Sequence, residues 1–201
     1  MDSIFSKIIS GEIPSYKVAE DSHCYAFLDI NPNSKGHVLC VPRLPTDKLF
    51  DLPSEEYNRL FSFSRKVALA MRKVIPCKRI ALSVIGLEIP HAHIHLIPIN
   101  KMDDVRFQKK VKISDSEMQK IANSIAQNFY SGTVIDENSE PIFGASIIVK
   151  KNSNFVQTDI DGNFLIEAEI NDILLISYSG FKNLELQLSN DYELNNIILI
   201  K

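Results

Sequence analysis

Three histidines spaced two residues apart, His91, His93 and His95, are the residues of this sequence best able to do chemistry. Alternate side chains share one face of a strand, so this spacing predicts a row of imidazoles on one side of a strand over residues 92–97. Ordinary core packing would have to satisfy the ring nitrogens of all three. The other interpretations are an exposed histidine stripe, a transition-metal site and nucleophilic catalysis.

Nucleophilic catalysis explains the three histidines better than these alternatives. Histidine triads do bind zinc and other transition metals, but no Asp, Glu or Cys stands nearby at ligand spacing. A neutral imidazole is a good nucleophile toward phosphorus, and its neighbours can orient it and neutralise charge. We therefore expect an enzyme that uses no metal and no other cofactor.

The periodicity of the apolar residues predicts the elements that must position these histidines. Helical spacing recurs in three segments, and compact β-type runs occur in five. The expected helices cover residues 4–9, 54–75 and 115–129. The expected strands cover residues 16–20, 24–29, 37–41, 79–85 and 92–97. Residues 101–112 are highly charged and are expected to form a loop.

The sequence changes character after Phe129. The apolar residues now alternate with a period of two, and turn-forming residues recur at short intervals, which is typical of a small β-sandwich. The formal charge changes as well, because residues 1–129 carry +4 and residues 130–201 carry −7. All five histidines and all three cysteines precede this boundary. We therefore expect two domains, residues 1–129 and 130–201.

The composition excludes several functions. The chain of 201 residues is 45% hydrophobic and 23% charged, as in an ordinary globular protein, and no apolar run is long enough to span a bilayer. A net charge of −3 gives no basic surface for nucleic acid. The first residues, from Met1 to Lys7, show no secretory signal, so we expect a cytoplasmic protein without nucleic-acid or membrane partners. The cysteines, Cys24, Cys40 and Cys77, are expected to be free thiols.

The segment from His91 to Pro98 resembles the signature of the histidine-triad (HIT) family of nucleotide hydrolases and transferases. Three more blocks resemble this family in the right order: its N-terminal helix, its ribose-contacting strand end, and the strand that carries a fourth histidine, here His37. These blocks are residues 4–14, 26–32 and 36–43. The resemblance implies an α+β fold for residues 1–129, with an antiparallel sheet of about five strands and two main helices, paired as a homodimer.

The resemblance also implies a reaction. In that family the middle histidine, here His93, attacks the α-phosphate of a nucleoside 5′-phosphoramidate or a dinucleoside polyphosphate, and water then releases the nucleoside monophosphate from the covalent nucleotidyl-histidine. His95 would fix the neighbouring geometry, while His91 and His37 would stabilise charge on the phosphoryl oxygens. Asp29 would accept hydrogen bonds from the ribose of a purine nucleotide. An apolar slot for the base would be formed by Phe5, Ile8, Phe27, Ile30 and Leu39.

The sequence departs from the family pattern in two places. Many bacterial relatives carry Cys-x-x-Cys in the first helix and hold a structural zinc, whereas Ser3 and Ser6 stand there in this chain, so we predict no such zinc. Before the triad the usual Asn is missing, Leu87 stands where Gln is usual, and Glu88 occupies a position that touches phosphate and leaving group. The alternatives are a nucleotide-binding protein of low turnover, or an interaction protein that uses its C-terminal β-sandwich.

Residues 131–201 resemble the carboxypeptidase regulatory-like β-sandwich found at the N-terminus of TonB-dependent receptors. The matching blocks are residues 131–136, 140–150, 158–164 and 176–181. Nothing in this segment is catalytic, because it holds no histidine or cysteine and its acidic residues are scattered at turns. The resemblance implies an interaction or spacer module, and a β-sandwich without any partner is the plain alternative.

Overall fold

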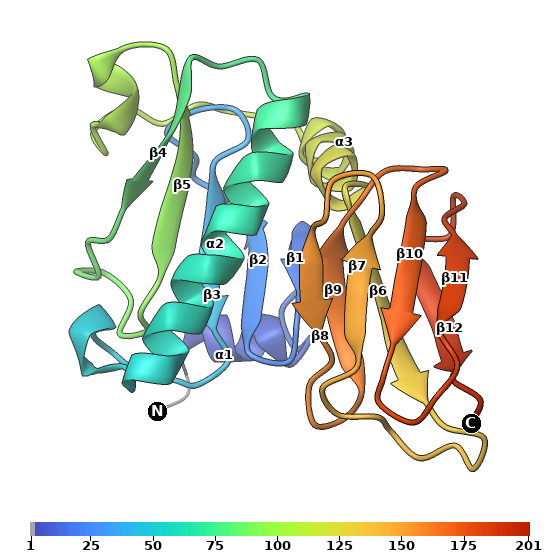
Figure 1. The fold of residues 1–201 in the computed structure, drawn as a ribbon. Coiled ribbons are helices and arrows are strands. Elements are labelled where there is room, and N and C mark those ends of the chain that lie inside the picture. The colour runs from blue at the N-terminus through green and yellow to red at the C-terminus, as the bar shows by residue number, and fades with distance from the viewer. Residues whose placement is uncertain (1–2) are drawn as a thin grey trace. The chain divides into compact units, whose positions relative to one another are not determined.

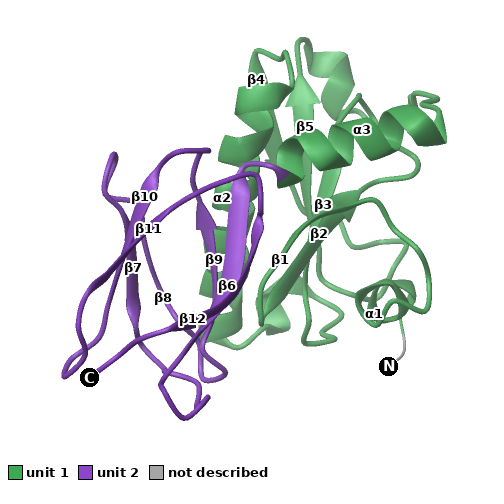
Figure 2. Cartoon of the chain, turned by 90° about the vertical axis from the view of Figure 1, so that its right-hand side faces the viewer, with its two compact units in different colours: residues 1–126 green, residues 127–201 purple. Residues whose placement is uncertain are grey.

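The computed structural model describes residues 3–201 (Figure 1). They form two compact units that divide between Ala126 and Gln127 (Figure 2). Met1 and Asp2, where the segment searched for a secretory signal begins, lie outside the described residues. No helix of residues 3–201 is both long and apolar enough to cross a membrane.

Unit 1 (residues 1–126) is built on one antiparallel sheet of five strands in the order β1-β2-β3-β5-β4. The strands are β1 (Lys17–Glu20), β2 (Cys24–Leu28), β3 (Val38–Pro42), β4 (Arg79–Ser83) and β5 (Ile94–Ile99). Every residue of β2 and β3 is buried, and both strands are mostly apolar, as strands covered on two faces must be. This architecture confirms the expected α+β fold with a five-stranded antiparallel sheet.

Two main helices pack side by side against this sheet. α2 (Ser54–Val74) buries residues at helical spacing, and its acidic first turn and basic last turn complement the helix dipole. Pro76 follows shortly after its end and cannot continue a helix. α3 (Asp115–Ala126) likewise buries one apolar face. The smaller helices are α1 (Ile4–Ile9), η1 (Leu49–Asp51) and η2 (Met102–Val105).

Successive side chains of a strand point to opposite faces of the sheet, so the two faces carry different residues. In the pairing of β3 with β5, Leu39 lies opposite His95, so these two side chains share one face. Leu96 points to the other face, where it lies beside residues of α2. One face therefore packs against the main helices, and the other face carries the histidine of β5.

The turn that enters β3 depends on Gly36. Its φ of +82° lies in the left-handed region, which favours glycine. A Cβ atom at this position would also collide with the side chain of Ile75, just after α2. The next residue is His37, so this close approach fixes where that imidazole enters the sheet.

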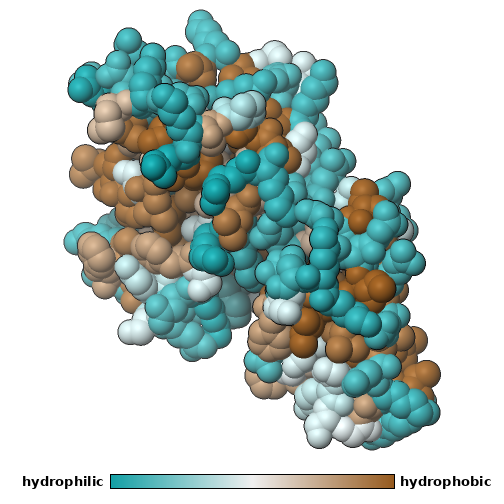
Figure 3. All heavy atoms as spheres, turned by 45° about the horizontal axis from the view of Figure 1, so that its top comes forward, coloured by the Kyte–Doolittle hydropathy of each residue, from teal (hydrophilic) through white to brown (hydrophobic). Residues whose placement is uncertain are grey.

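The β4 edge of the sheet carries exposed apolar surface. β4 is the last strand in the sheet order, and its Leu82 is 50% exposed. Beside it lies a groove of about 490 Å³ between α2 and the edge of the sheet. The lining residues are Phe61, Ser62, Ser64, Arg65, Ala68, Ile80, Leu82 and Leu96. Figure 3 shows hydrophobic residues gathered on the side of unit 1 where Figure 1 places β4.

The strand expected over residues 92–97 is placed two residues too early. β5 begins at Ile94, so of the three triad histidines only His95 belongs to it. A competing partner explains the difference, because the backbone N–H of Ala92 donates to the carbonyl of Thr46 at 2.6 Å, outside the sheet. The triad is therefore not a row along one strand.

The expectation that Phe129 belongs to the last helix of unit 1 is wrong. α3 ends at Ala126, and Phe129 is the first residue of β6 (Phe129–Ile135), where it pairs with Glu167. Aromatic and β-branched residues favour a strand wherever a partner strand is available. That partner lies far along the sequence, so the local helical period was misleading here.

Unit 2 (residues 127–201) is all β and contains two sheets, one of four strands in the order β11-β10-β7-β8 and one of three in the order β12-β6-β9. The strands after β6 are β7 (Ser146–Val149), β8 (Phe155–Gln157), β9 (Asn163–Glu167), β10 (Ile173–Ser177), β11 (Leu184–Gln187) and β12 (Glu193–Ile198). Residues from both sheets, among them Tyr130, Ile147 and Ile176, form one buried core. This confirms the expected all-β fold of the C-terminal part.

The first and last strands of unit 2 are neighbours in space. β12 pairs in parallel with β6, with Glu193 opposite Ser131 and Ile198 opposite Ile135. A parallel pair needs a long crossover connection, and here the other strands of unit 2 supply it.

We expect the two units to unfold in two separate thermal transitions, because each has its own buried core. Calorimetry of the full chain is the measurement, and a protein without residues 131–201 is the comparison. The deletion should remove one transition and leave the other within a few degrees. A single cooperative transition in the full chain would contradict this expectation.

Candidate active site

Four histidines of unit 1 come together although separate parts of the chain supply them. The ring centroids of His93 and His95 are 4.8 Å apart, and those of His37 and His95 are 5.2 Å apart. His37 and His91 have no exposed surface, while His93 and His95 are 6% and 8% exposed. The structure thus assembles all four expected catalytic histidines in one buried cluster that reaches solvent only at His93 and His95.

The hydrogen bonds of His93 determine which of its nitrogens carries the proton. Its Nδ1 lies 2.7 Å from the carbonyl oxygen of His91, and a carbonyl can only accept. Nδ1 therefore carries the hydrogen, and Nε2 keeps a free lone pair in the neutral ring. An imidazole in this tautomer is a nucleophile at Nε2.

The ring of His91 is held from both sides. Its Nε2 donates to the carbonyl oxygen of Pro42 at 2.8 Å, which leaves Nδ1 to accept from the hydroxyl of Ser3 at 2.7 Å. Ser3 is the N-cap of α1, and its oxygen also accepts from the backbone N–H of Ser6 at 3.1 Å. The start of α1 thus fixes His91, whose carbonyl in turn orients His93.

Sequence reasoning missed the contact between Ser3 and His91. A serine directly before an apolar helical run is an N-cap signal, which locates Ser3 but not its distant partner. The structure also bears on the zinc of Cys-x-x-Cys relatives. Neutral hydroxyls are poor substitutes for cysteine thiolates, and that of Ser3 is engaged with His91 and α1. These residues do not fit such a zinc, and we assign no step to a metal.

His37 and His95 form a second series of hydrogen bonds. Nδ1 of His37 accepts from the backbone N–H of Asn33 at 3.2 Å, so Nε2 carries the hydrogen and donates to Nδ1 of His95 at 3.0 Å. The hydrogen of neutral His95 therefore sits on Nε2, where it can donate to a bound ligand. A carboxylate oxygen of Asp29 lies 3.4 Å from Nδ1 of His37, but the shorter backbone contact favours the tautomer given above.

Burial keeps these imidazoles neutral. Desolvation lowers the pKa of His37 and of His95 to about 3, and it is the largest cause of the lowered pKa of the other two rings. At His93 the hydrogen bond to a backbone carbonyl and the carboxylates of Asp29 and Glu88 oppose this lowering. The nitrogen best placed to attack phosphorus is therefore unprotonated at neutral pH.

Asp29 is the carboxylate beside the cluster, just after β2. Its Oδ1 accepts from the backbone N–H of Asn31 at 2.8 Å, and its own backbone N–H donates to the carbonyl of His37 at 2.9 Å. Asp29, His37 and His95 offer ligand atoms within 4.8 Å of one another, which is a spacing that could hold a metal ion. The nitrogens that face each other across the two histidines are already hydrogen-bonded, so a metal would have to displace that bond.

The apolar residues expected to hold a base form one cluster between α1 and the sheet, with one exception. The buried members are Phe5, Ile8, Phe27 and Leu39. Phe5 makes edge contacts with Phe27 and with His93, at 5.5 and 5.1 Å between ring centroids. Ile30 is 75% exposed and lies outside this buried cluster. Glu88, in the segment before the triad, is also exposed and acts on His93 through its charge.

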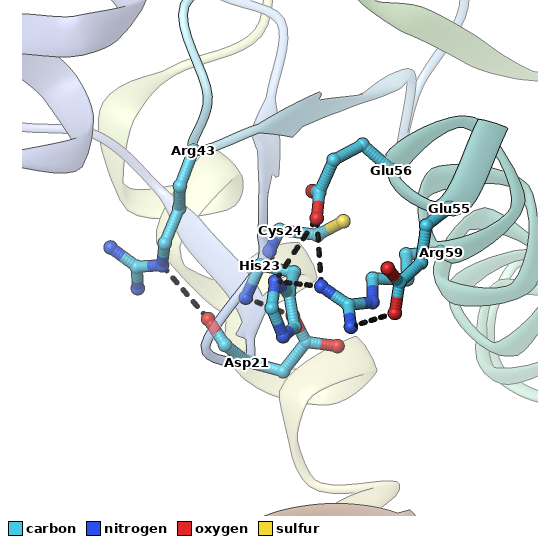
Figure 4. Close-up of polar contacts among 7 residues, drawn as sticks. All are labelled: Asp21, His23, Cys24, Arg43, Glu55, Glu56 and Arg59. Carbon is cyan, nitrogen blue, oxygen red and sulfur yellow. Dashed lines mark hydrogen bonds and ion pairs between the residues drawn. The ribbon is translucent and has the colours of Figure 1, made fainter. Parts of the chain in front are cut away.

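The fifth histidine, His23, belongs to a separate polar cluster at the turn between β1 and β2 (Figure 4). Its Nδ1 accepts from Arg59 of α2 at 2.8 Å, and Arg59 also pairs with Glu56 at 2.7 Å. Within the turn, Oδ1 of Asp21 accepts from two backbone N–H groups at 2.9 and 2.7 Å. These contacts join the turn to the start of α2. Half-exposed ion pairs of this kind contribute little individually, and the cluster is structural.

Known proteins resemble the part of the chain that contains this site. Residues 10–102 match the family model described as HIT domain. Over 136 residues the chain is 31% identical to an uncharacterized HIT-like protein of Borreliella burgdorferi, which covers 98% of that protein and 63% of this chain. The chain belongs to the HIT family.

The HIT domain has further relatives, and the C-terminal part matches a different family model. Adenosine 5′-monophosphoramidase HNT1 of Saccharomyces cerevisiae is 38% identical over 96 residues, which cover 47% of this chain and 61% of that protein. The crystal structure of a Hit-like protein from Bartonella henselae has a TM-score of 0.57 and 27% identity, covering 62% of this chain and 94% of that one. Residues 130–201 match the family model described as CarboxypepD_reg-like domain. Both resemblances drawn from the sequence are confirmed.

The buried neutral histidines make the stability of unit 1, called the HIT domain from here on, depend on pH. Their pKa values are lowered in the folded protein, whereas in the unfolded chain each returns to about 6.5. Below about 6.5 the unfolded chain binds more protons than the folded one, so these groups reduce the free energy of unfolding as pH falls and have no effect above that value. We expect the thermal midpoint of the HIT domain to fall between pH ~7 and pH ~5.

Unit 2 contains no histidine and is the internal control for this measurement. Its midpoint should change less over the same range of pH. An equal fall in both units, or a HIT domain that becomes more stable on acidification, would show that the histidines are not held neutral by burial.

Proposed function

We propose that the HIT domain is a nucleotide hydrolase or transferase that cleaves at the α-phosphate through a covalent nucleotidyl-His93 intermediate. Its substrate is a nucleoside 5′-phosphoramidate or a dinucleoside polyphosphate with a purine base. One observation carries this proposal: a main-chain carbonyl 2.7 Å from Nδ1 of His93 holds the hydrogen there and leaves the lone pair on Nε2.

The proposed reaction has two steps. In the first, the lone pair on Nε2 of His93 forms a bond to the α-phosphorus, and the bond from phosphorus to the leaving group breaks. A phosphate leaving group departs as an anion, and a departing nitrogen takes a proton from solvent. In the second, a water oxygen attacks phosphorus and loses a proton to solvent, and the bond to Nε2 breaks, which frees the nucleoside monophosphate and restores His93.

The neighbouring histidines orient the reaction in this proposal. The N–H at Nε2 of His95 donates a hydrogen bond to a phosphoryl oxygen or to the leaving atom as charge develops there. The family resemblance implies charge stabilisation by His91 and His37, but both are buried and neutral and both ring nitrogens of each are already bonded. We therefore give these two rings the role of holding His93 and His95 in place.

Nucleotide recognition in this proposal uses the face of the sheet that carries the histidines. Asp29 lies next to His37 and accepts the ribose hydroxyls. The cluster of Phe5, Phe27 and Leu39 gives the base an apolar floor next to His93, and we assign the exposed Ile30, which follows Asp29, to the side of the base that faces solvent. The printed name of the yeast relative, an adenosine 5′-monophosphoramidase, supports a purine nucleotide as substrate.

Incubation with adenosine 5′-phosphoramidate should release AMP, which is measured by chromatography. His93→Ala removes the attacking nitrogen and should lower kcat/KM by about a thousandfold or more. The matched control is His23→Ala, which removes an imidazole from the separate polar cluster and should keep the rate within about twofold. Turnover that survives His93→Ala would refute the covalent mechanism. Nucleotide binding without release of AMP from either substrate class would favour the low-turnover alternative.

We further propose that two copies of the HIT domain pair through the apolar groove at β4. An edge strand offers unpaired backbone groups, and the exposed Leu82 and the groove beside it offer apolar surface next to them. A second copy turned about a two-fold axis presents the same strand and groove, so one surface satisfies both partners. The homodimer implied by the family resemblance is therefore assigned to this face.

Sedimentation at micromolar concentration should show the full chain as a dimer. Leu82→Glu places a charge in the apolar face and should shift the protein to monomer, because burying an unpaired carboxylate is costly. Phe50→Glu is the matched control, since Phe50 is 87% exposed on η1 and lies outside the groove. A monomeric parent protein, or a Leu82→Glu variant that stays dimeric, would rule out this interface.

A further inference from the structure

The segment that follows the triad covers two histidines of the buried cluster, His95 and His37. It comprises residues 100–113 and includes η2, and most of it lies beyond the residues that match the HIT family model, 10–102. The ring of Phe107 makes edge contacts with His95 at 4.9 Å and with His37 at 6.3 Å between centroids. The segment therefore forms a wall of the site that the triad motif does not predict.

Lys110 makes one contact that fastens this wall to the loop before His37 and one contact within the wall. Its Nζ donates to Oδ1 of Asn33 at 2.8 Å, and the ammonium lies 5.0 Å from the centroid of Phe107. Asn33 is also the residue whose backbone N–H holds Nδ1 of His37. Lys110 is thus connected to the histidine cluster through both of its contacts.

Lys110 supplies the positive charge that the neutral histidines lack. Besides desolvation, which is the largest cause, its ammonium helps to lower the pKa of His37 and of His95, while the carboxylate of Asp29 acts in the opposite direction on His95 and on His93. The two contacts of the ammonium, an amide oxygen and an aromatic ring, are neutral. Within residues 3–201 its charge is therefore not cancelled by an ion pair, and an anionic ligand would find it available.

The place of Lys110 fits a group beyond the reacting phosphate. A series of ring contacts leads from the attacking histidine to the ammonium of Lys110. The ring centroid of His95 lies 4.8 Å from that of His93 and 4.9 Å from that of Phe107, and the ammonium lies 5.0 Å from the centroid of Phe107. Two rings thus separate the ammonium from the attacking histidine along this series of contacts. The flexible stem of a lysine allows the ammonium to exchange the Asn33 amide for a nearby anion.

We propose that Lys110 binds the phosphate chain of the leaving group. This inference rests on the proposed function and narrows its substrate class to nucleotides in which further phosphates follow the α-phosphate, such as dinucleoside polyphosphates. A phosphate anion makes a charge-assisted contact with an ammonium group, whereas the nitrogen of a phosphoramidate brings no negative charge to it.

The test compares two substrates on three proteins. The parent chain, Lys110→Gln and Lys110→Arg are assayed with diadenosine tetraphosphate and with adenosine 5′-phosphoramidate. Lys110→Gln should lower the ratio of kcat/KM for the tetraphosphate to that for the phosphoramidate by about tenfold or more, mainly through KM, and Lys110→Arg should keep the ratio within about threefold. Lys109→Gln, which removes the charge of the exposed neighbouring lysine, is the matched control and should leave the ratio unchanged.

An unchanged ratio in Lys110→Gln, or equal losses on both substrates, would overturn the inference and leave Lys110 the role of fastening the wall. If the parent chain releases AMP from neither substrate, the proposed reaction fails, and dissociation constants for AMP and ADP decide the role of Lys110. Lys110→Gln should then raise the dissociation constant of ADP more than that of AMP. An equal rise in the two dissociation constants overturns the inference. A parent chain that binds neither nucleotide overturns both the inference and the proposed function.

Discussion

A neutral imidazole has one nitrogen that donates and one that accepts, and in this site main-chain groups decide which is which. The carbonyl of Pro42 accepts a hydrogen bond from the ring of His91, and the carbonyl of His91 accepts one from the ring of His93. The backbone N–H of Asn33 donates a hydrogen bond to the ring of His37. Since the rings are out of water, a wrong tautomer would leave a buried polar group without a partner. The direction of every proton is therefore set before a ligand arrives, which is the kind of preorganisation that electrostatic catalysis requires.

These main-chain groups come from three places that the fold of the HIT domain brings together. They are the end of β3, the loop before it, and the segment that precedes β5. The sheet makes this possible because its other face takes the packing of α2, so the histidine face is left to α1 and to the segment after β5. Gly36 contributes by letting the loop before β3 approach the end of α2 closely, next to His37.

The parts of the site that the sequence predicts are those encoded at short range. The spacing of the triad predicts the cluster even though His93 precedes the strand, because residues two apart stay close in an extended segment, and the family resemblance then singles out His93. The partners of Ser3 and Lys110 are different, since they lie 88 and 77 positions away in the sequence. No periodic pattern encodes such a pair. Phe129 shows the same limit in the fold, because its partner strand is supplied by a distant part of unit 2.

The strand order of unit 2 makes the order of synthesis matter. The sheet of the HIT domain is complete once residue 99 has been made, and α3 ends at Ala126, whereas β6 lacks one neighbour until β12 is finished at Ile198. Chains fold from the N-terminus as they leave the ribosome, so unit 1 can close while β6 still has an open edge. Open strand edges recruit other strands. The β-sandwich, rather than the HIT domain, is then the part whose solubility depends on how quickly translation reaches its last strand.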